Sequence, residues 1–221
     1  MRSKCVLVVL FCVQMWAQAV TQQEILSQIT GAVLPVAEKS ILSFGAKGDG
    51  KKDCKPAFDK AMQYAKRQNG LRILVPPGDY LINGPIHLVS HVCIDLAEGA
   101  VLRFSDQPEH YLPVVETSWE GAPCWNYSPF IYGKDLEDVA IVGKGTIDGN
   151  ASATFALWKE KQADDVRLLR DYNHSRVAVS ERRFGEGHYL RPHLIQLYGC
   201  KRVTIQGLFI TRAPFWCVHL L

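Results

Sequence analysis

Five side chains in the second half of the sequence are suited to binding a polar ligand that also has apolar surface. Arg191 carries a planar guanidinium, which can grip a carboxylate through two charge-assisted hydrogen bonds. Trp119 and Trp216 offer apolar ring faces with a polar edge. Glu120 could accept a hydrogen bond from a hydroxyl group, and His219 could exchange one with a ligand. A surface arginine, core tryptophans, a loop carboxylate and a structural histidine are the ordinary alternatives.

Paired carboxyl groups could perform acid–base catalysis, but no pair in the sequence is well placed for it. Asp164 and Asp165 are adjacent, and their charged surroundings indicate a solvated face. Asp148 precedes Gly149, and an Asp-Gly turn after a strand explains it. Asp95 lies in a strand-like run without a partner that can be named. We therefore assign no catalytic residue.

Cysteine usage argues against a metal site. The first 19 residues hold Cys5 and Cys12, and five cysteines follow them: Cys54, Cys93, Cys124, Cys200 and Cys217. An odd number leaves at least one unpaired within the chain. No C-x-x-C spacing is present, so we expect no zinc. We expect Cys93 and Cys217 to be buried among apolar residues, and we expect no metal and no cofactor.

The elements that must position these residues are mostly short strands. Residues 41–44 predict a strand, and residues 55–68 predict an amphipathic helix that buries Ala57, Phe58, Ala61, Met62 and Ala65. From Arg72 onward, short β-rich runs follow one another without helices between them. This arrangement excludes a doubly wound α/β sheet, which needs crossover helices. It leaves a sandwich, a meander or a β-solenoid. The runs are 73–75, 80–82, 86–88, 92–96 and 101–104.

Internal repetition favours the solenoid. The pentapeptide at 139–143 (VAIVG) resembles that at 203–207 (VTIQG), and 92–96 (VCIDL) is a degenerate third copy whose glycine comes at Gly99. Alternate residues in each copy can point to one side. Stacked coils would bury these residues as one continuous core. The sequence therefore predicts an all-β parallel β-helix with a short capping helix near its N-terminus.

The N-terminus has the pattern of a signal peptide. Arg2 and Lys4 precede an apolar run that ends at Trp16, and residues 17–19 (AQA) form a small-x-small cleavage site. We expect a signal peptide over 1–19 with cleavage near Ala19, and hence a secreted or periplasmic protein. The apolar run is too short to span a bilayer, and we expect no membrane span.

The rest of the chain reads as one domain. Residues 20–40 form a lead-in, and 41–221 form the β-helix domain. The charged stretch 151–190, which we expect to be partly helical over 156–172, is either an inserted loop that builds a cleft wall or a mobile solvated loop. Without the leader, the chain has 23 basic and 22 acidic residues. This nearly neutral balance does not suggest a nucleic-acid partner.

Ordered motifs along the chain carry a family resemblance. The segment 43–50 (SFGAKGDG), the helix after it and 75–80 (VPPGDY) resemble the N-terminal cap of pectin-degrading β-helix proteins. Later segments are similar to glycoside hydrolase family 28, and most to its bacterial, exo-acting polygalacturonase branch. These segments are 119–121 (WEG), 126–129 (NYSP), 143–149 (GKGTIDG), 191–196 (RPHLIQ) and 213–219 (APFWCVH). His193 and Cys217 are unusual for that branch.

The resemblance implies a right-handed parallel β-helix that hydrolyses α-1,4-galacturonosyl links in pectin with inversion. It implies a pectic polysaccharide or oligogalacturonide as the partner, a monomer for the full-length protein, and substrate contacts from Trp119, Glu120, Arg191, Trp216 and His219. The family's Asn-Thr-Asp, Gly-His-Gly and Arg-Ile-Lys motifs do not occur in the sequence, and its one Asp-Asp pair, Asp164-Asp165, lies in the charged stretch 151–190. We therefore expect an N-terminal portion, cut on its C-terminal side, that is inactive and poorly soluble alone.

Two other classes of function stay open. A β-helix pectate lyase would use calcium and a basic residue to abstract a proton. A non-catalytic carbohydrate-binding solenoid would need neither the aspartate motifs nor a calcium cluster.

Overall fold

The computed structural model describes residues 21–221. The predicted signal peptide lies outside these residues. The chain divides into a short segment that ends at Thr30 and a large compact unit, Gly31–Leu221. The first segment contains helix α1 (Gln22–Gln28), which begins with a capping box between Thr21 and Glu24.

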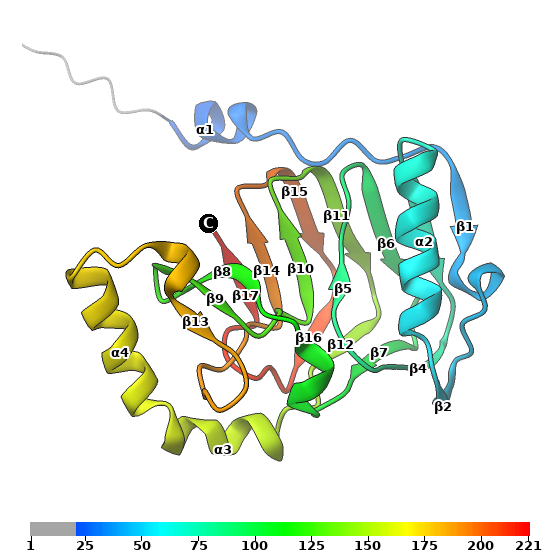
Figure 1. The fold of residues 1–221 in the computed structure, drawn as a ribbon. Helices are drawn as coiled ribbons and strands as arrows, with labels where there is room; N and C mark the ends of the chain where they lie inside the picture. The colour runs from blue at the N-terminus through cyan, green and yellow to red at the C-terminus, as the bar shows by residue number, and fades with distance from the viewer. Residues whose placement is uncertain (1–20) are drawn as a thin grey trace, which may run out of the picture. The chain divides into compact units, whose positions relative to one another are not determined.

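The large unit is a parallel β-helix. Successive strands of the chain are distributed in rotation over three sheets, and each strand pairs in parallel with the strand one coil away. Figure 1 shows strands β5, β10 and β14 side by side, with strands β6, β11 and β15 behind them. This arrangement confirms the predicted all-β solenoid.

The first sheet contains the predicted repeats in register. Val139 pairs with Val203 on one side and with Val92 on the other, so the three pentapeptides stack as parallel rungs. In the third copy, the residue that pairs with Gly143 is Leu96, and not Gly99 as the sequence comparison suggested. The strands of this sheet are β1 (Glu38–Ser40), β3 (Leu71–Val75), β6 (Val92–Leu96), β11 (Glu137–Gly143) and β15 (Lys201–Gln206).

The other two coil sheets close the solenoid around a shared core. The second sheet stacks Tyr80, Leu102, Ile147 and Ile210 in register. Its strands are β2 (Asp49–Asp53), β4 (Gly78–Ile82), β7 (Ala100–Phe104), β12 (Thr146–Asp148) and β16 (Phe209–Thr211). The third sheet contains β5 (Ile86–His87), β10 (Ile131–Lys134), β14 (Ile195–Tyr198) and β17 (Val218–Leu220). We call it the binding sheet, because the candidate site lies on it.

Helix α2 (Lys55–Arg67) takes the place of a binding-sheet strand in the first coil (Figure 1). The five residues predicted to face the core are its buried residues, which confirms the helix and its orientation. The strand predicted over 41–44 is wrong, because Ile41–Phe44 forms a 3-10 helix, η1. Ser40 caps this helix and Gly45 ends it in the left-handed conformation, so the strand closes at Ser40 instead.

Two excursions leave the coils between the second sheet and the binding sheet. The first holds η2 (Pro108–Tyr111) and the antiparallel hairpin of β8 (Val115–Trp119) and β9 (Ala122–Asn126). The second, one coil later, holds α3 (Thr154–Lys161), α4 (Ala163–His174), η3 (Val179–Glu181) and β13 (Arg183–Phe184). The helices confirm the helical expectation for 156–172.

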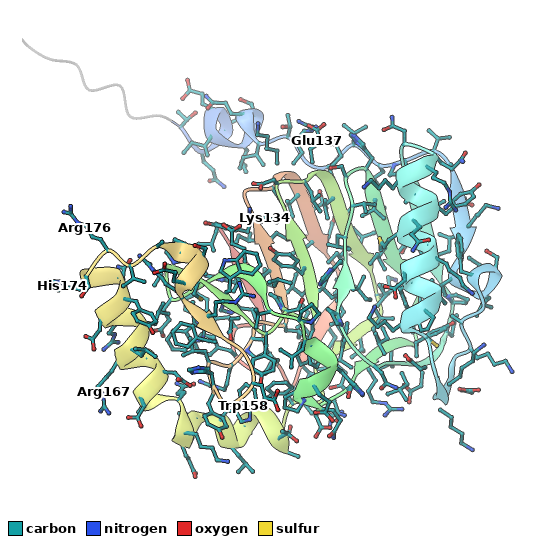
Figure 2. The ribbon with its side chains drawn as sticks, viewed as in Figure 1. Lys134, Glu137, Trp158, Arg167, His174 and Arg176 are labelled. Carbon is teal, nitrogen blue, oxygen red and sulfur yellow. The ribbon has the colours of Figure 1, made fainter. Side chains whose placement is uncertain are left out.

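The two excursions meet because they leave adjacent coils at the same corner. Strand β13 pairs with β9 in parallel, and Figure 1 shows both beside β14 and β17. Figure 2 shows Arg167, His174 and Arg176 projecting away from the body, whereas Trp158 is buried and packs on Phe155.

All five cysteines within residues 21–221 are unpaired. Cys93 is buried as predicted, but the prediction for Cys217 is wrong, because this residue precedes β17 at the surface and is exposed. Within the same residues, no helix is both long and apolar enough to cross a membrane.

Candidate functional site

A row of four polar or aromatic side chains crosses the binding sheet. His87, Tyr132, Gln196 and His219 occupy equivalent positions on β5, β10, β14 and β17. Their neighbours Ile86, Ile131, Ile195 and Val218 form the alternate row in the core. Since side chains alternate between the faces of a strand, the polar row lies on the outer face, toward the hairpin β8–β9.

The hairpin supplies hydrogen-bond partners for this row. The Tyr132 hydroxyl donates to the Glu116 carbonyl at 2.5 Å. Gln196 is fully buried, and its Nε2 donates to the Ser118 carbonyl at 3.1 Å and to His219 Nδ1 at 2.9 Å. Thr117 Oγ1 donates to Gln196 Oε1. These contacts hold the end of the row in one arrangement.

His193 lies beside the row as a buried, neutral imidazole. Its ring centroid is 4.1 Å from that of His219 and 5.3 Å from that of Phe215. Its Nε2 donates to the Ser118 carbonyl at 3.1 Å, whereas its buried Nδ1 has no partner. Burial and then the neighbouring His219 lower the pKa of His193 to about 3, and the Ser118 hydrogen bond only partly opposes them.

Phe215 is the centre around which the predicted arginine and one tryptophan assemble. The Trp119 ring stacks on it with 5.0 Å between centroids and 7° between planes. The Arg191 guanidinium lies 4.8 Å from the Phe215 centroid, a cation–π contact. Trp119 Nε1 also donates to the Arg191 carbonyl at 3.2 Å. Trp119 is buried, so it supports Arg191 by packing.

Arg191 is oriented by the second excursion and by the segment before β17, and it keeps free donors. Its Nε donates to Gln162 Oε1 at 2.9 Å, and its Nη1 donates to the Pro214 carbonyl at 3.2 Å. Its Nη2 forms no hydrogen bond among the described residues. Partial burial lowers the pKa of Arg191 and Glu120 opposes this shift, but a guanidinium stays charged at any ordinary pH.

Trp216 and His219 complete the group. The Trp216 side chain is 47% exposed. Its ring contacts the His219 ring edge-on, with 5.2 Å between the two ring centroids. Burial lowers the pKa of His219, which favours the neutral ring. We call Trp119, Arg191, His193, Phe215, Trp216 and His219 the Phe215 cluster.

Four of the five residues predicted from the sequence therefore come together in the Phe215 cluster. The fifth, Glu120, lies at the hairpin tip with a positive φ of 48° and is exposed. It lines a separate cavity of about 130 Å³, together with Trp119 and residues of α4 such as Arg170.

Sequence reasoning did not identify Phe215, Gln196, Gln162 or Thr117 as site residues. An available signal was the repeated pair of a β-branched residue and a polar or aromatic one at 86–87, 131–132, 195–196 and 218–219. Aligning these pairs would have placed Gln196 beside His219.

Each aspartate that was considered as a catalytic candidate pairs with another side chain in the structure. Asp95 pairs with Arg72 one coil away, with 3.0 Å from Nε to Oδ2. Asp148 is buried and pairs with Arg212, in addition to the turn contact from the Asn150 amide. Asp164 is solvated as predicted, but the prediction for Asp165 is wrong, because it is buried and lies 2.7 Å from His188 Nδ1. Over residues 21–221, no group of three or more histidine, cysteine and acidic side chains is placed to hold a metal ion.

Comparisons with known proteins agree with this architecture. Residues 39–95 match the family model of rhamnogalacturonase A/epimerase, pectate lyase-like proteins. A hyperthermoactive exopolygalacturonase from Thermotoga maritima is 40% identical with a TM-score of 0.86, and the match covers 90% of this chain and 47% of that one. No curated protein matches the chain.

Two further structures are more distant. A putative glycosyl hydrolase from Parabacteroides merdae is 26% identical with a TM-score of 0.57, and the match covers 80% of this chain and 66% of that one. A family 28 exopolygalacturonase from Yersinia enterocolitica is 22% identical with a TM-score of 0.58, with 81% and 35% covered, and supports the fold alone. The chain thus spans about half the length of the Thermotoga enzyme, and it is a parallel β-helix similar to that exopolygalacturonase.

Proposed function

We propose that this chain forms part of a family 28, exo-acting glycoside hydrolase that cleaves α-1,4-galacturonosyl links of pectin. The observation that carries the proposal is the convergence of Arg191, Trp216 and His219 at the outer face of the binding sheet. The 40% identity to an exopolygalacturonase over 90% of the chain supports the same class of substrate.

Each group matches a feature of a galacturonate unit. The free Nη2 of Arg191 can donate to the sugar carboxylate, and the stacking on Phe215 holds the guanidinium plane for that contact. The exposed ring of Trp216 offers an apolar face to the C–H surface of the sugar. His219 can exchange a hydrogen bond with a hydroxyl or carboxylate oxygen.

The reaction itself is assigned by resemblance. Inverting hydrolysis needs two carboxyl groups about 6.5–9.5 Å apart, with one acting as acid and the other activating water. The family places these carboxylates in an Asn-Thr-Asp motif, which this sequence lacks, and in an Asp-Asp pair, whose one counterpart here, Asp164-Asp165, lies on helix α4. The residues described here, including Trp119 and Glu120, therefore have binding and supporting roles in the proposal.

The proposal includes the organisation and destination of the chain. It divides the chain into a signal peptide over 1–19, a lead-in over 20–40 and a β-helix domain over 41–221, with 151–190 inserted as a cleft wall. The protein is exported to the periplasm or the medium, and the full-length enzyme acts as a monomer. Mass spectrometry of the exported fraction should find a mature N-terminus near Val20, and an intact Met1 would contradict export.

Ligand binding tests the site directly. Calorimetric titration of the full-length protein with digalacturonate should show binding that Arg191→Gln weakens roughly 10- to 100-fold, the range expected for a charge-assisted hydrogen-bonded pair. Arg183→Gln is a matched control, because Arg183 also lies 4.8 Å from a ring centroid, that of Trp125, but outside the Phe215 cluster. Equal losses in the two variants, or no binding by the wild type, would contradict the proposal.

Product analysis separates the three classes of function. The proposal predicts that the full-length protein releases saturated galacturonate from polygalacturonate without added calcium. Calcium-dependent release of unsaturated products would indicate the lyase, and binding without any product would indicate the carbohydrate-binding solenoid.

A further inference from the structure

The orientation of the Gln196 side-chain amide is determined by its neighbours. The Ser118 carbonyl can only accept a hydrogen bond, so the Gln196 atom 3.1 Å away must be the nitrogen. The other amide atom is then the oxygen, which accepts from the Thr117 hydroxyl. Gln196 is fully buried, and reversing the amide would place two acceptors against each other at Ser118.

This orientation determines which nitrogen of His219 carries the proton. Gln196 Nε2 has two hydrogens, one for the Ser118 carbonyl and one directed at His219 Nδ1, 2.9 Å away. Nδ1 must therefore accept, and a neutral ring then has its proton on Nε2. Nε2 forms no hydrogen bond among the described residues. It is also not one of the fully buried atoms without a partner, so it keeps some exposure to solvent. It is available to a ligand.

We propose that Gln196 is a positioning residue that fixes His219 as a neutral Nε2–H donor, aimed at a hydroxyl or carboxylate oxygen of a bound uronic acid. This inference rests on the proposed function for the identity of the ligand. It assigns the control of His219 to strand β8 of the hairpin, through the Thr117 hydroxyl and the Ser118 carbonyl.

The arrangement distinguishes this role from simple packing. A leucine could fill the same volume, but it would leave the Thr117 hydroxyl and the Ser118 carbonyl with fewer partners and His219 free to take either tautomer. A glutamate would impose the opposite tautomer, because its carboxylate accepts from Nδ1–H. The same position can therefore set either polarity at the ligand-facing nitrogen.

Nitrogen-15 spectroscopy of the histidine rings tests the tautomer without reference to activity. In the wild-type full-length protein, with His219 assigned through His219→Asn, we expect Nε2 to be protonated and Nδ1 to carry no proton. Gln196→Glu should move the proton to Nδ1 and weaken digalacturonate binding roughly tenfold, the loss expected for one hydrogen bond. Gln206→Glu, the same change at an exposed position of β15, should alter neither property.

A second pair of variants covers the case in which Gln196→Glu does not fold. Thr117→Val removes the donor to the amide oxygen and should produce mixed tautomers with weaker binding, whereas Thr117→Ser should restore both properties. A wild-type His219 protonated on Nδ1 overturns the inference, as does full affinity in a variant whose tautomer has changed. If the tautomer is as expected but the wild type does not bind digalacturonate, the proposed function and the ligand fail while the positioning role of Gln196 holds.

Discussion

Trp119 of the hairpin and Phe215 of the last coil lie nearly parallel, with ring centroids 5.0 Å apart and planes 7° apart. The pair joins β8 to the segment before β17, and Arg191 rests on the same phenyl ring. The position of the proposed carboxylate-binding group therefore depends on an aromatic contact between segments that are distant in sequence.

A double-mutant cycle should detect this contact. We expect Trp119→Ala to destabilise the protein by about 3–5 kcal/mol, since the ring is buried. The coupling energy with Phe215→Ala should be about 0.5–1.5 kcal/mol, as for other aromatic pairs. Denaturant unfolding measures both quantities. Phe209→Ala, at a side chain that is 64% exposed, is the control, and additive losses at Trp119 and Phe215 would contradict the coupling.

His193 should make stability depend on pH. Its pKa is about 3 in the folded chain and about 6.5 when unfolded. Below pH 6.5 the unfolded chain therefore takes up a proton that the folded chain does not. The free energy of unfolding should fall as pH decreases from 6.5 to 5, by up to about 1.4 kcal/mol per pH unit for this one group.

His193→Asn should reduce that slope, measured by urea unfolding at several pH values. His174→Asn, at an exposed histidine, controls for the loss of one imidazole. An unchanged slope in the His193 variant would show that this ring takes up its proton equally in both states. His219 contributes in the same direction, because its pKa is also lowered.

Asp148 and Arg212 should couple adjacent coils. The Asp148 side chain is 10% exposed, and Arg212 Nε donates to its Oδ1 at 2.7 Å. We expect Arg212→Met to cost about 1–3 kcal/mol, because the carboxylate is then buried without its partner. Adding Asp148→Asn should recover part of this loss in thermal unfolding. A double variant as unstable as the sum of the single variants would exclude coupling.

Gly143 should tolerate no side chain. Its φ is 116°, and an added Cβ would lie 2.0 Å from the Leu96 carbonyl oxygen one coil away. Gly143→Ala therefore combines backbone strain with a clash and should cost more than 2 kcal/mol, to order of magnitude. Gly45→Ala separates the two effects, because Gly45 has a φ of 99° but nothing within 4 Å of its Cβ position. Equal losses at both glycines would show that the clash relaxes.

Periodicity in the sequence was sufficient for the core and the stacking. Helix α2 buries the five residues that its spacing indicates, and Val92, Val139 and Val203 stack as the repeats predict. These features are local or repeated, so a pattern along the chain contains them. The strand expected over 41–44 failed because Ser40 and Gly45 impose cap geometry over a segment that is too short for periodicity to decide.

The burial of two residues outside the strands was not predictable in this way. Cys217 is apolar in type yet exposed, and Asp165 is charged yet buried against His188. In each case a partner from another part of the chain, or its absence, decides the environment. Residue type alone carries no information about that partner.

The sequence by itself determined the β-helix, its capping helix, its repeat register and the resemblance to exopolygalacturonases. It also contained the residues of the Phe215 cluster but not their roles. Only the tertiary structure decided that Thr117 and Ser118 bind Gln196 across separations of 79 and 78 residues, and that Gln196 then sets the proton of His219. The physical reason is that hydrogen-bond polarity depends on which groups meet in space. That meeting depends on the first excursion, which places β8 against the outer face of β14.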